Sequence, residues 1–177
     1  MMRLALTAIG VFAVLGLFYM GLQVDTRDLP SPLIGKSAPP FELPSLTEPE
    51  TMLTEQDFLG EVALVNVFAS WCRTCWSEHS SLVALQKQGL TIFGINYRDQ
   101  RKAALEYLDR GGNPYTHVVF DPNGDAGLEW GVYATPETFL LDTKGRIRFK
   151  HVGPLGTRVI DEEFLPRIEQ LRAEAAS

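Results

Sequence analysis

The chain has 177 residues, which favours one domain and leaves little room for a second. Its hydrophobic share of 45% and charged share of 21% exclude a mainly disordered chain, and two cysteines are too few for a disulfide-dense mini-protein. The net charge of −6, without a lysine/arginine block, argues against a nucleic-acid partner, because phosphate binding needs a basic surface.

The first segment is strongly apolar: Leu4 to Leu22 is a run of residues without a charge, and Arg3 precedes it. A helix of that length reaches about 28 Å, close to the thickness of a bilayer core. A cation on the N-terminal flank favours an N-in, C-out orientation. We therefore expect residues 1–22 to be a single transmembrane signal-anchor. A cleaved signal peptide is the alternative, although no small-x-small cleavage site is obvious. Both interpretations export the rest of the chain.

Residues 23–40 are rich in proline and include Gly35, so we expect a linker and the start of an N-terminal extension, a tether rather than a packed element. Residues 41–177 carry the pattern of one α/β domain. Its expected elements are a short strand at 41–43, a capped helical turn at 54–58, a strand at 62–69, a helix at 72–88, a strand at 90–97, a helix capped by Asp99 and ended by Gly111-Gly112, a strand at 117–120, a short helix at 126–130, a hairpin of 138–142 with 146–152, and a closing helix at 160–175.

The two apolar strands set the fold class. Residues 62–69 read VALVNVFA, a nearly unbroken apolar run that is typical of a strand buried on both faces. Strands and helices alternate up to the final hairpin. This order predicts a layered α/β domain whose central strands are parallel and whose last pair is antiparallel.

The cysteines stand at the junction of the first buried strand and the following helix, in the run Trp71-Cys72-Arg73-Thr74-Cys75. A redox cysteine needs a stabilised thiolate, and a helix N-terminus supplies unpaired N–H groups and a partial positive charge. Arg73 adds a cation. Cys75 lies one turn deeper on the same face, within reach of a disulfide. We expect Cys72 to attack and Cys75 to resolve.

Three other interpretations of the cysteine pair compete with this one. A purely structural disulfide across so short a loop adds little constraint to the unfolded chain. A zinc half-site needs two further ligands, and only His79, His117 and His151 are available, none in an H-x3–5-H pair. Two merely buried cysteines are not expected side by side after a tryptophan. In an oxidising compartment the CxxC motif indicates a dithiol–disulfide couple.

On these motifs the chain resembles the thioredoxin superfamily and, within it, the membrane-anchored periplasmic CcmG/DsbE type thiol:disulfide interchange proteins of cytochrome c maturation. The resemblance covers about residues 33–172 and includes the N-terminal apolar segment. The runs that carry it are IGKSAPPFELP (34–44), LVNVFASWC (64–72), EH (78–79), GINYRD (94–99), GNPY (112–115) and GVYATPETF (131–139).

The resemblance implies a thioredoxin-like α/β fold, three-layered with a central mixed sheet, an N-terminal extension and a helix–strand insertion at residues 100–120. It implies a redox-active disulfide between Cys72 and Cys75 and a cis bond at Thr135–Pro136, where a trans turn proline would be the ordinary alternative. In the family this loop borders the substrate peptide, so Thr135, Pro136 and Trp71 are expected to contact partners. Core packing is the alternative for Trp71.

Glu78 is the first of two acidic candidates. Thioredoxins usually place a buried aspartate six residues before the first cysteine, and this chain has Asn66 there. Glu78, three residues past Cys75 on the same helical face, would accept the proton of Cys75 if burial raised its pKa. An exposed helix glutamate is the alternative.

Glu137 is the second candidate, because it follows Pro136 and should lie near Cys72. Its negative charge would disfavour the thiolate and repel acidic partners, which would set partner choice. A solvated charge at the end of a strand is the alternative. Arg73 stands where the family more often has proline, so the redox potential is left unassigned.

We therefore expect a reductase anchored in the bacterial inner membrane with its thioredoxin-like domain in the periplasm. Its clients, by resemblance, are disulfides of apocytochrome c or of an apocytochrome-handling partner, and a membrane thiol-reducing donor regenerates the dithiol. No metal or organic cofactor is required, because the dithiol carries both electrons. The alternatives are a related anchored reductase for copper sites or general disulfides and a non-enzymatic copper chaperone.

Overall fold

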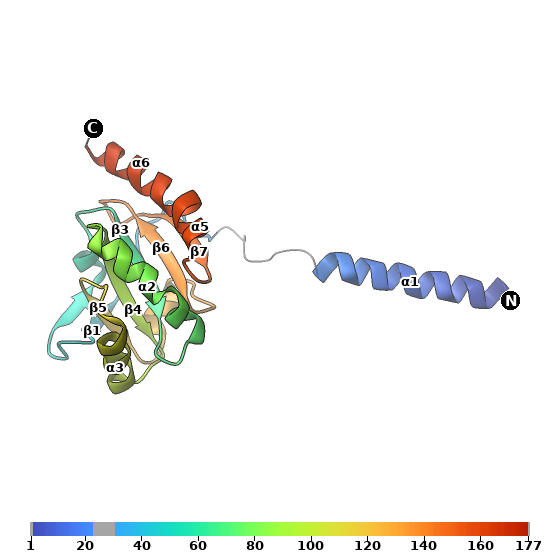
Figure 1. The fold of residues 1–177 in the computed structure, drawn as a ribbon, viewed down its shortest axis with the longest axis horizontal. Coiled ribbons are helices and arrows are strands. Elements are labelled where there is room, and N and C mark those ends of the chain that lie inside the picture. Colours follow the sequence, from blue (N-terminus) through green and yellow to red (C-terminus); the bar gives the residue numbers. More distant parts are fainter. Residues whose placement is uncertain (1, 23–30, 177) are drawn as a thin grey trace. The chain divides into compact units, whose positions relative to one another are not determined.

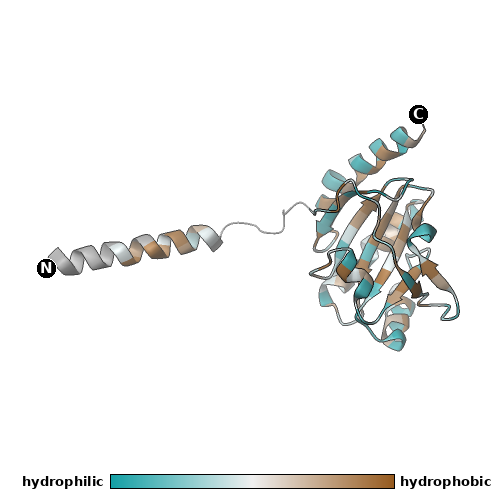
Figure 2. Ribbon diagram, turned by 180° about the vertical axis from the view of Figure 1, so that it is seen from behind, coloured by the Kyte–Doolittle hydropathy of each residue, from teal (hydrophilic) through white to brown (hydrophobic). Residues whose placement is uncertain are grey.

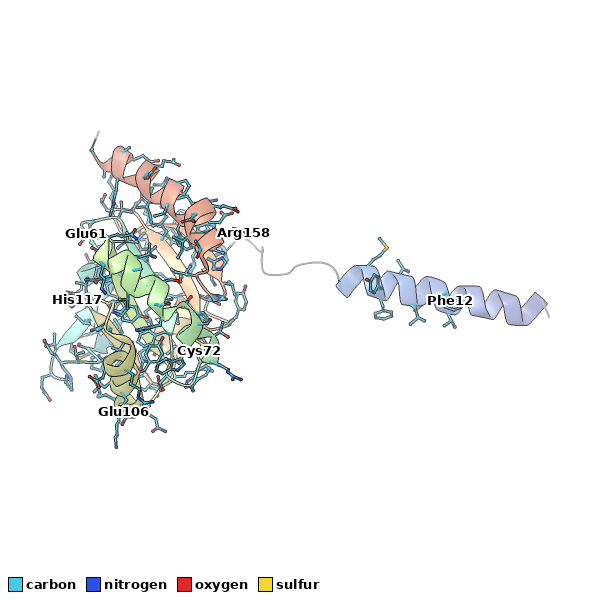
Figure 3. The ribbon with its side chains drawn as sticks, in the orientation of Figure 1. Phe12, Glu61, Cys72, Glu106, His117 and Arg158 are labelled. Atoms are coloured by element: carbon cyan, nitrogen blue, oxygen red, sulfur yellow. A yellow bond between two sulfur atoms is a disulfide. The ribbon has the colours of Figure 1, made fainter. Side chains whose placement is uncertain are left out.

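The computed structural model describes residues 2–22 and 31–176. It divides into two compact units, Met1–Pro30 and Ser31–Ser177 (Figure 1). The first unit contains helix α1 (Met2–Leu22), from which Phe12 projects into the surroundings (Figure 3). Within the two described ranges, no helix combines the length and the hydropathy needed to cross a membrane.

The second unit is built on a five-stranded sheet in the order β5-β4-β3-β6-β7. Strands β3, β4 and β5 are parallel, β6 runs antiparallel to β3, and β7 runs antiparallel to β6. Their bounds are Ala63–Phe68 for β3, Thr91–Tyr97 for β4, Val118–Asp121 for β5, Glu137–Leu141 for β6 and Ile147–Val152 for β7. This mixed sheet is the one that the strand pattern predicts.

Helices cover both faces of this sheet, which gives three layers. On one face α2 (Arg73–Lys87), α3 (Arg101–Gly111) and α6 (Leu165–Ala175) pack on side chains such as Leu64, Ile92 and Leu140. On the other face the 3-10 turn η2 (Glu55–Phe58), the short pair β1 (Glu42–Pro44) and β2 (Met52–Thr54), and α4 (Asp125–Glu129) form the second layer. Figure 2 shows the apolar strands between these layers.

The alternation of β3 explains why it is apolar throughout. Leu64 and Phe68 point to the α2 side, and Val65 and Val67 point to the opposite side, so all four lie in a core. The polar exception, Asn66, points to the α2 side with them and is fully buried. Burying an amide costs free energy unless its hydrogen bonds are made, and Asn66 makes three, to Glu78, Thr138 and Tyr115.

We expected residues 23–40 to form a tether. For residues 31–40 this expectation is wrong, and residues 23–30 lie outside the described residues. Gly35 and Ala38 donate their backbone N–H groups to the carbonyls of Ile147 and Gly145, and Ile147 donates to Lys36. Residues 31–40 are therefore part of the domain. Strand β2 was also not expected; its three residues carry too little periodicity to predict it.

Two helix starts differ from the expectation. Gln100, not Asp99, is the N-cap of α3, because the carboxylate of Asp99 is turned back to the loop after β3. The closing helix begins at Thr157 rather than at residue 160, as α5 (Thr157–Val159), a π-helical turn η3 (Ile160–Phe164) and α6. The capped turn at 54–58 is confirmed by a capping box between Thr54 and Asp57.

Candidate active site

Cys72 and Cys75 form a disulfide at the start of α2, with Cys72 as the N-cap residue. The Sγ atom of Cys72 accepts the backbone N–H of Cys75 at 3.1 Å, so the sulfur occupies the position where helix N–H groups stabilise negative charge. Figure 3 labels Cys72 at this end of the helix. Cys72 keeps 4% of its surface exposed and Cys75 keeps none. Both residues are thus buried and Cys72 is the less enclosed of the two, while the order of attack stays a prediction.

The loop that carries the first cysteine is held by the turn after β4. The carboxylate of Asp99 accepts both the backbone N–H and the hydroxyl of Ser70. The indole N–H of Trp71 donates to the carbonyl of Arg98 at 2.9 Å. Arg98 has the positive φ of 47°, an uncommon conformation for a residue with a side chain. These contacts fix the chain on the N-terminal side of Cys72.

Trp71 is a surface residue and not part of the core. Its side chain is 58% exposed although its N–H is bonded. The core-packing alternative is therefore wrong. A rigid, exposed indole directly beside the disulfide is suited to contact a partner protein.

The loop before β6 lies at the same end of the sheet as the disulfide. Strands β3 and β6 pair with Val67 opposite Glu137, so Pro136 and the chain that leads from β3 to Cys72 meet at that end. The Thr135–Pro136 bond is cis, as the resemblance implies. Pro136 is buried and Thr135 is half-buried. The backbone on the N-terminal side of Pro136 stays outside the β3–β6 ladder, where a peptide strand can align with it.

Glu137 is fully buried, so the alternative of a solvated charge is wrong. Its Oε1 atom accepts the backbone N–H groups of Tyr133 and Ala134, and its Oε2 atom pairs with Nζ of Lys150 at 2.8 Å. The Lys150 side chain is 7% exposed and also donates to the carbonyl of Gly131. The carboxylate thus holds the loop before Pro136 in place. With its charge balanced by Lys150, it presents little net charge to a partner.

Glu78 is also buried, which removes the alternative of an exposed helix glutamate. Its Oε1 accepts from Nδ2 of Asn66 at 2.9 Å, and its Oε2 accepts the backbone N–H of Leu155 at 2.7 Å. No cation is among these partners. Burial raises the pKa of Glu78 to about 7, while the hydrogen bonds from Leu155 and Asn66 act in the opposite direction. A carboxyl group with this pKa exchanges a proton at neutral pH.

Helix α3, in the insertion, packs against the first turns of α2. The hydroxyl of Tyr107 lies 3.2 Å from the carbonyl of Cys75 and 2.9 Å from Nδ1 of His79, and Nε2 of His79 lies 2.7 Å from the carbonyl of Gly112. Trp76 covers the Tyr107 ring edge-on. Burial raises the pKa of Tyr107 above its usual range, so its hydroxyl stays protonated.

The residues predicted from the sequence thus gather at one end of the sheet: the two cysteines and Glu78 on α2, Trp71 before it, and residues 135–137 at the start of β6. Three neighbours were missed. The predicted hairpin could have indicated Lys150 as a neighbour of Glu137. Lys150 pairs with Phe139, which lies two residues after Glu137 on the same face of β6. The contacts of Asp99 and Tyr115 join residues far apart in the chain, and no local signal marks them.

Comparison with known proteins identifies the family. The profile of the Redoxin family matches residues 33–164. A thiol:disulfide interchange protein DsbE from Allochromatium vinosum is 46% identical over 164 residues, 92% of this chain and 91% of the relative. The DsbE protein of Pseudomonas aeruginosa is 44% identical over 170 residues, 96% of this chain and 94% of the relative.

Comparison with a solved structure supports the same family assignment at the level of the fold. The crystal structure of a Chlorobium tepidum protein, described as a thiol:disulfide interchange protein DsbE, is similar with a TM-score of 0.65 at 27% identity. The match covers 81% of this chain and 98% of that one. The chain therefore belongs to the Redoxin family and, within it, to the thiol:disulfide interchange proteins of the DsbE (CcmG) type.

Proposed function

We propose that this thiol:disulfide oxidoreductase works as a reductant of disulfides in apocytochrome c, or in the partner that handles it, during cytochrome c maturation. The observation that carries disulfide exchange is the position of the Cys72 sulfur at the N-cap of α2, where it accepts the N–H of Cys75, and the reductive direction rests on the resemblance to the family. Such an environment favours the thiolate, which is the form that attacks a disulfide.

The exchange proceeds in two steps. In the first, the Cys72 thiolate attacks one sulfur of the client disulfide, forms a mixed disulfide and releases one client thiolate. In the second, the Cys75 thiol gives its proton to Glu78 and the resulting thiolate attacks the Cys72 sulfur. The second client thiolate leaves, and the Cys72–Cys75 dithiol, now oxidised to the disulfide, has given two electrons to the client.

Glu78 supports the second step by its place and its pKa. It lies one helical turn beyond Cys75, and its pKa of about 7 lets it be ionised before the step and protonated after it. Asn66 cannot take this role, because an amide does not accept a proton at neutral pH.

The peptide-binding end is assigned to Trp71 and to the segment Thr135–Glu137. Trp71 is exposed beside the disulfide, and Thr135 is half-buried and precedes the first paired residue of β6, which would let an extended peptide align there. Glu137 contributes by holding the loop, through two N–H groups and Lys150, rather than by its charge.

We further propose that the domain faces the periplasm from an anchor at residues 1–22. The uncharged run from Leu4 to Leu22 and the preceding Arg3 support this orientation. A membrane thiol-reducing protein would then return two electrons to the disulfide. Carbonate extraction of membranes and proteolysis of spheroplasts test the anchor: release by carbonate, or resistance of the domain to added protease, would contradict it.

Trapping identifies the client. Cys75→Ser leaves the attacking sulfur but removes the one that resolves, so a mixed disulfide on Cys72 should accumulate in cells. The matched control Cys72→Ser should trap nothing. Recovery of an apocytochrome or its handling partner supports the proposal.

The alternatives give different results in the same experiment. Recovery of a copper-site protein would indicate a related reductase with another client. Stoichiometric copper on the purified reduced protein, together with no disulfide reduction, would indicate a copper chaperone. Either result would overturn the cytochrome assignment.

A further inference from the structure

Tyr115 lies in the segment between α3 and β5 and has no part in the exchange reaction described above. Its hydroxyl is 2.8 Å from Oδ1 of Asn66. The same Asn66 side chain donates through Nδ2 to Oε1 of Glu78 at 2.9 Å and to the hydroxyl of Thr138 at 3.0 Å. One buried amide therefore connects Tyr115 to the proton acceptor.

The tyrosine ring sits in a slot that is built for it. Gly94 on β4 faces the ring, and a Cβ atom there would lie 3.2 Å from ring carbons of Tyr115. The ring of Phe68 stacks on Tyr115, with centroids 4.8 Å apart and planes inclined by 15°. Asn113 accepts the backbone N–H of Tyr115 through Oδ1 at 3.0 Å. The hydroxyl is thus aimed at Asn66 by three separate contacts.

The direction of each hydrogen bond follows from its partners. Burial raises the pKa of Tyr115 well above its ordinary value, so its hydroxyl keeps its proton and donates. The amide oxygen of Asn66 must receive that proton, which leaves the NH2 group facing Glu78. If the amide were reversed, its oxygen would face a carboxylate oxygen at hydrogen-bond distance, and ionised Glu78 would lose a donor.

We propose that Tyr115 is a positioning residue for disulfide exchange: its hydroxyl fixes the Asn66 amide with the NH2 group toward Glu78 and so supports the ionised form that receives the Cys75 proton. This inference rests on the proposed role of Glu78. Hydrogen bonds in a buried chain polarise one another, so the bond from Tyr115 also strengthens the one from Asn66 to Glu78.

The other ionisable groups on the side of the sheet where Glu78 lies are Cys75 and His79 on α2, Tyr107 on α3, Tyr115 itself and His151 on β7, which pairs with Thr138. In the oxidised protein the cysteines do not titrate, and burial keeps both tyrosines protonated. The ring of His79 bonds Tyr107 and Gly112 rather than Glu78, and the ring of His151 packs edge-on against Phe164.

The test is the titration of the Glu78 carboxyl carbon by NMR in the oxidised full-length chain labelled with 13C-glutamate. We expect Tyr115→Phe, which keeps the stacked ring, to move the Glu78 midpoint upward by about half to one pH unit, the size expected from weakening one hydrogen bond. Tyr97→Phe is the matched control, because Tyr97 packs with the core cluster on the opposite face of the sheet. An unchanged midpoint in Tyr115→Phe, or an equal shift in Tyr97→Phe, overturns the inference.

A second measurement needs no variant. In the wild-type chain the side-chain amide protons of Asn66 should shift with the same midpoint as the Glu78 carboxyl carbon, because they are bonded to it. If the chemical shifts of these amide protons do not change with the Glu78 titration, the inference is overturned, even if Tyr115→Phe fails to fold.

Kinetics separate this inference from the proposed function. Tyr115→Phe should slow release of the mixed disulfide about 2- to 5-fold at pH 7, because raising the midpoint from about 7 by half to one unit lowers the ionised fraction of Glu78 by that factor, and should have no effect in a Glu78→Gln background. Equal slowing in both backgrounds would show a merely structural role and overturn the inference. Trapping by Cys75→Ser tests the proposed function separately, since it depends only on Cys72.

Discussion

Two buried carboxylates lie at the active end of this domain, and they are held in opposite ways. Glu137, at the start of β6, has two backbone N–H groups and the ammonium of Lys150 around it. Glu78, on α2, has one backbone N–H and one amide, with no cation among them. Burial raises the pKa of Glu78 to about 7.

The difference shows that burial alone does not make a carboxylate a proton acceptor. A buried charge beside a matched cation is a structural tie, because separating the pair costs more than either partner contributes. A buried charge with only neutral donors is close to balance between its two protonation states. Sequence position placed both glutamates near the cysteines; their partners decide their roles.

Removing the cation from the first carboxylate should give the largest effect. In Lys150→Met, Glu137 would be left buried and unpaired, and we expect the free energy of unfolding to fall by about 3–5 kcal/mol. Urea denaturation of the oxidised protein measures it. Lys144→Met is the control, since Lys144 is exposed on the neighbouring turn. A loss below about 1 kcal/mol would show that the ion pair is not a structural tie.

The second carboxylate should make stability depend on pH. Its pKa is about 7 in the folded chain against 4.5 for the ordinary group, so the folded state holds the extra proton between these values. Its contribution is therefore complete below about pH 4.5 and is lost as pH rises to 7, by about 3 kcal/mol.

Urea midpoints between pH 4.5 and 8 measure this loss against Glu78→Gln, in which that part of the pH dependence should disappear. Identical slopes for the two proteins would mean that Glu78 titrates normally.

Exchange kinetics should separate the two sites. Glu78→Gln removes the proton acceptor of the second step, and we expect disulfide reduction to slow about 10- to 100-fold at pH 7–8. The inflection near pH 7 should vanish from the rate profile. Glu129→Gln, on the exposed side of α4, is the control. A rate and profile equal to wild type would remove Glu78 from the mechanism.

The smallest change in the free energy of unfolding is expected from removing the charge of Glu137 in its ion pair with Lys150. In Glu137→Gln the side-chain oxygen can still accept N–H groups, but Lys150 loses its counter-charge, and we expect about 1–3 kcal/mol of destabilisation. The inflection near pH 7 should persist. If instead the ratio of exchange rates with acidic and with basic test peptides differs between Glu137→Gln and wild type, the charge of Glu137 does set partner choice, as the sequence suggested.

The predictable parts of this fold are the ones that local patterns encode. The run at 62–69 is β3, and the CxxC motif stands at the N-cap of α2, because an apolar run and a strand–helix junction are visible within a few residues. The cis bond at Pro136 came from the resemblance and not from the local pattern.

The partners of the site could not be predicted, because they come from distant segments. Glu78 accepts hydrogen bonds from Asn66, which lies 12 positions earlier in the chain, and from Leu155, which lies 77 positions later. Its burial depends on both partners. Asp99 looks like a helix cap in the sequence, yet Ser70, 29 positions earlier, takes its carboxylate. Where a side chain has two possible hydrogen-bond partners of similar strength, the packing around it decides which one it takes. A single sequence does not show that packing.

The attachment of residues 31–40 has a mechanical consequence. Gly35 and Ala38 are fastened to Ile147 and Gly145, at the turn that joins β6 to β7. This turn follows the C-terminal end of β6, whereas Pro136 and the disulfide lie beyond its N-terminal end. A force applied to residues 31–40 would thus act on the rim of the sheet opposite to the one that carries the disulfide, and the geometry of the two sulfur atoms would be spared.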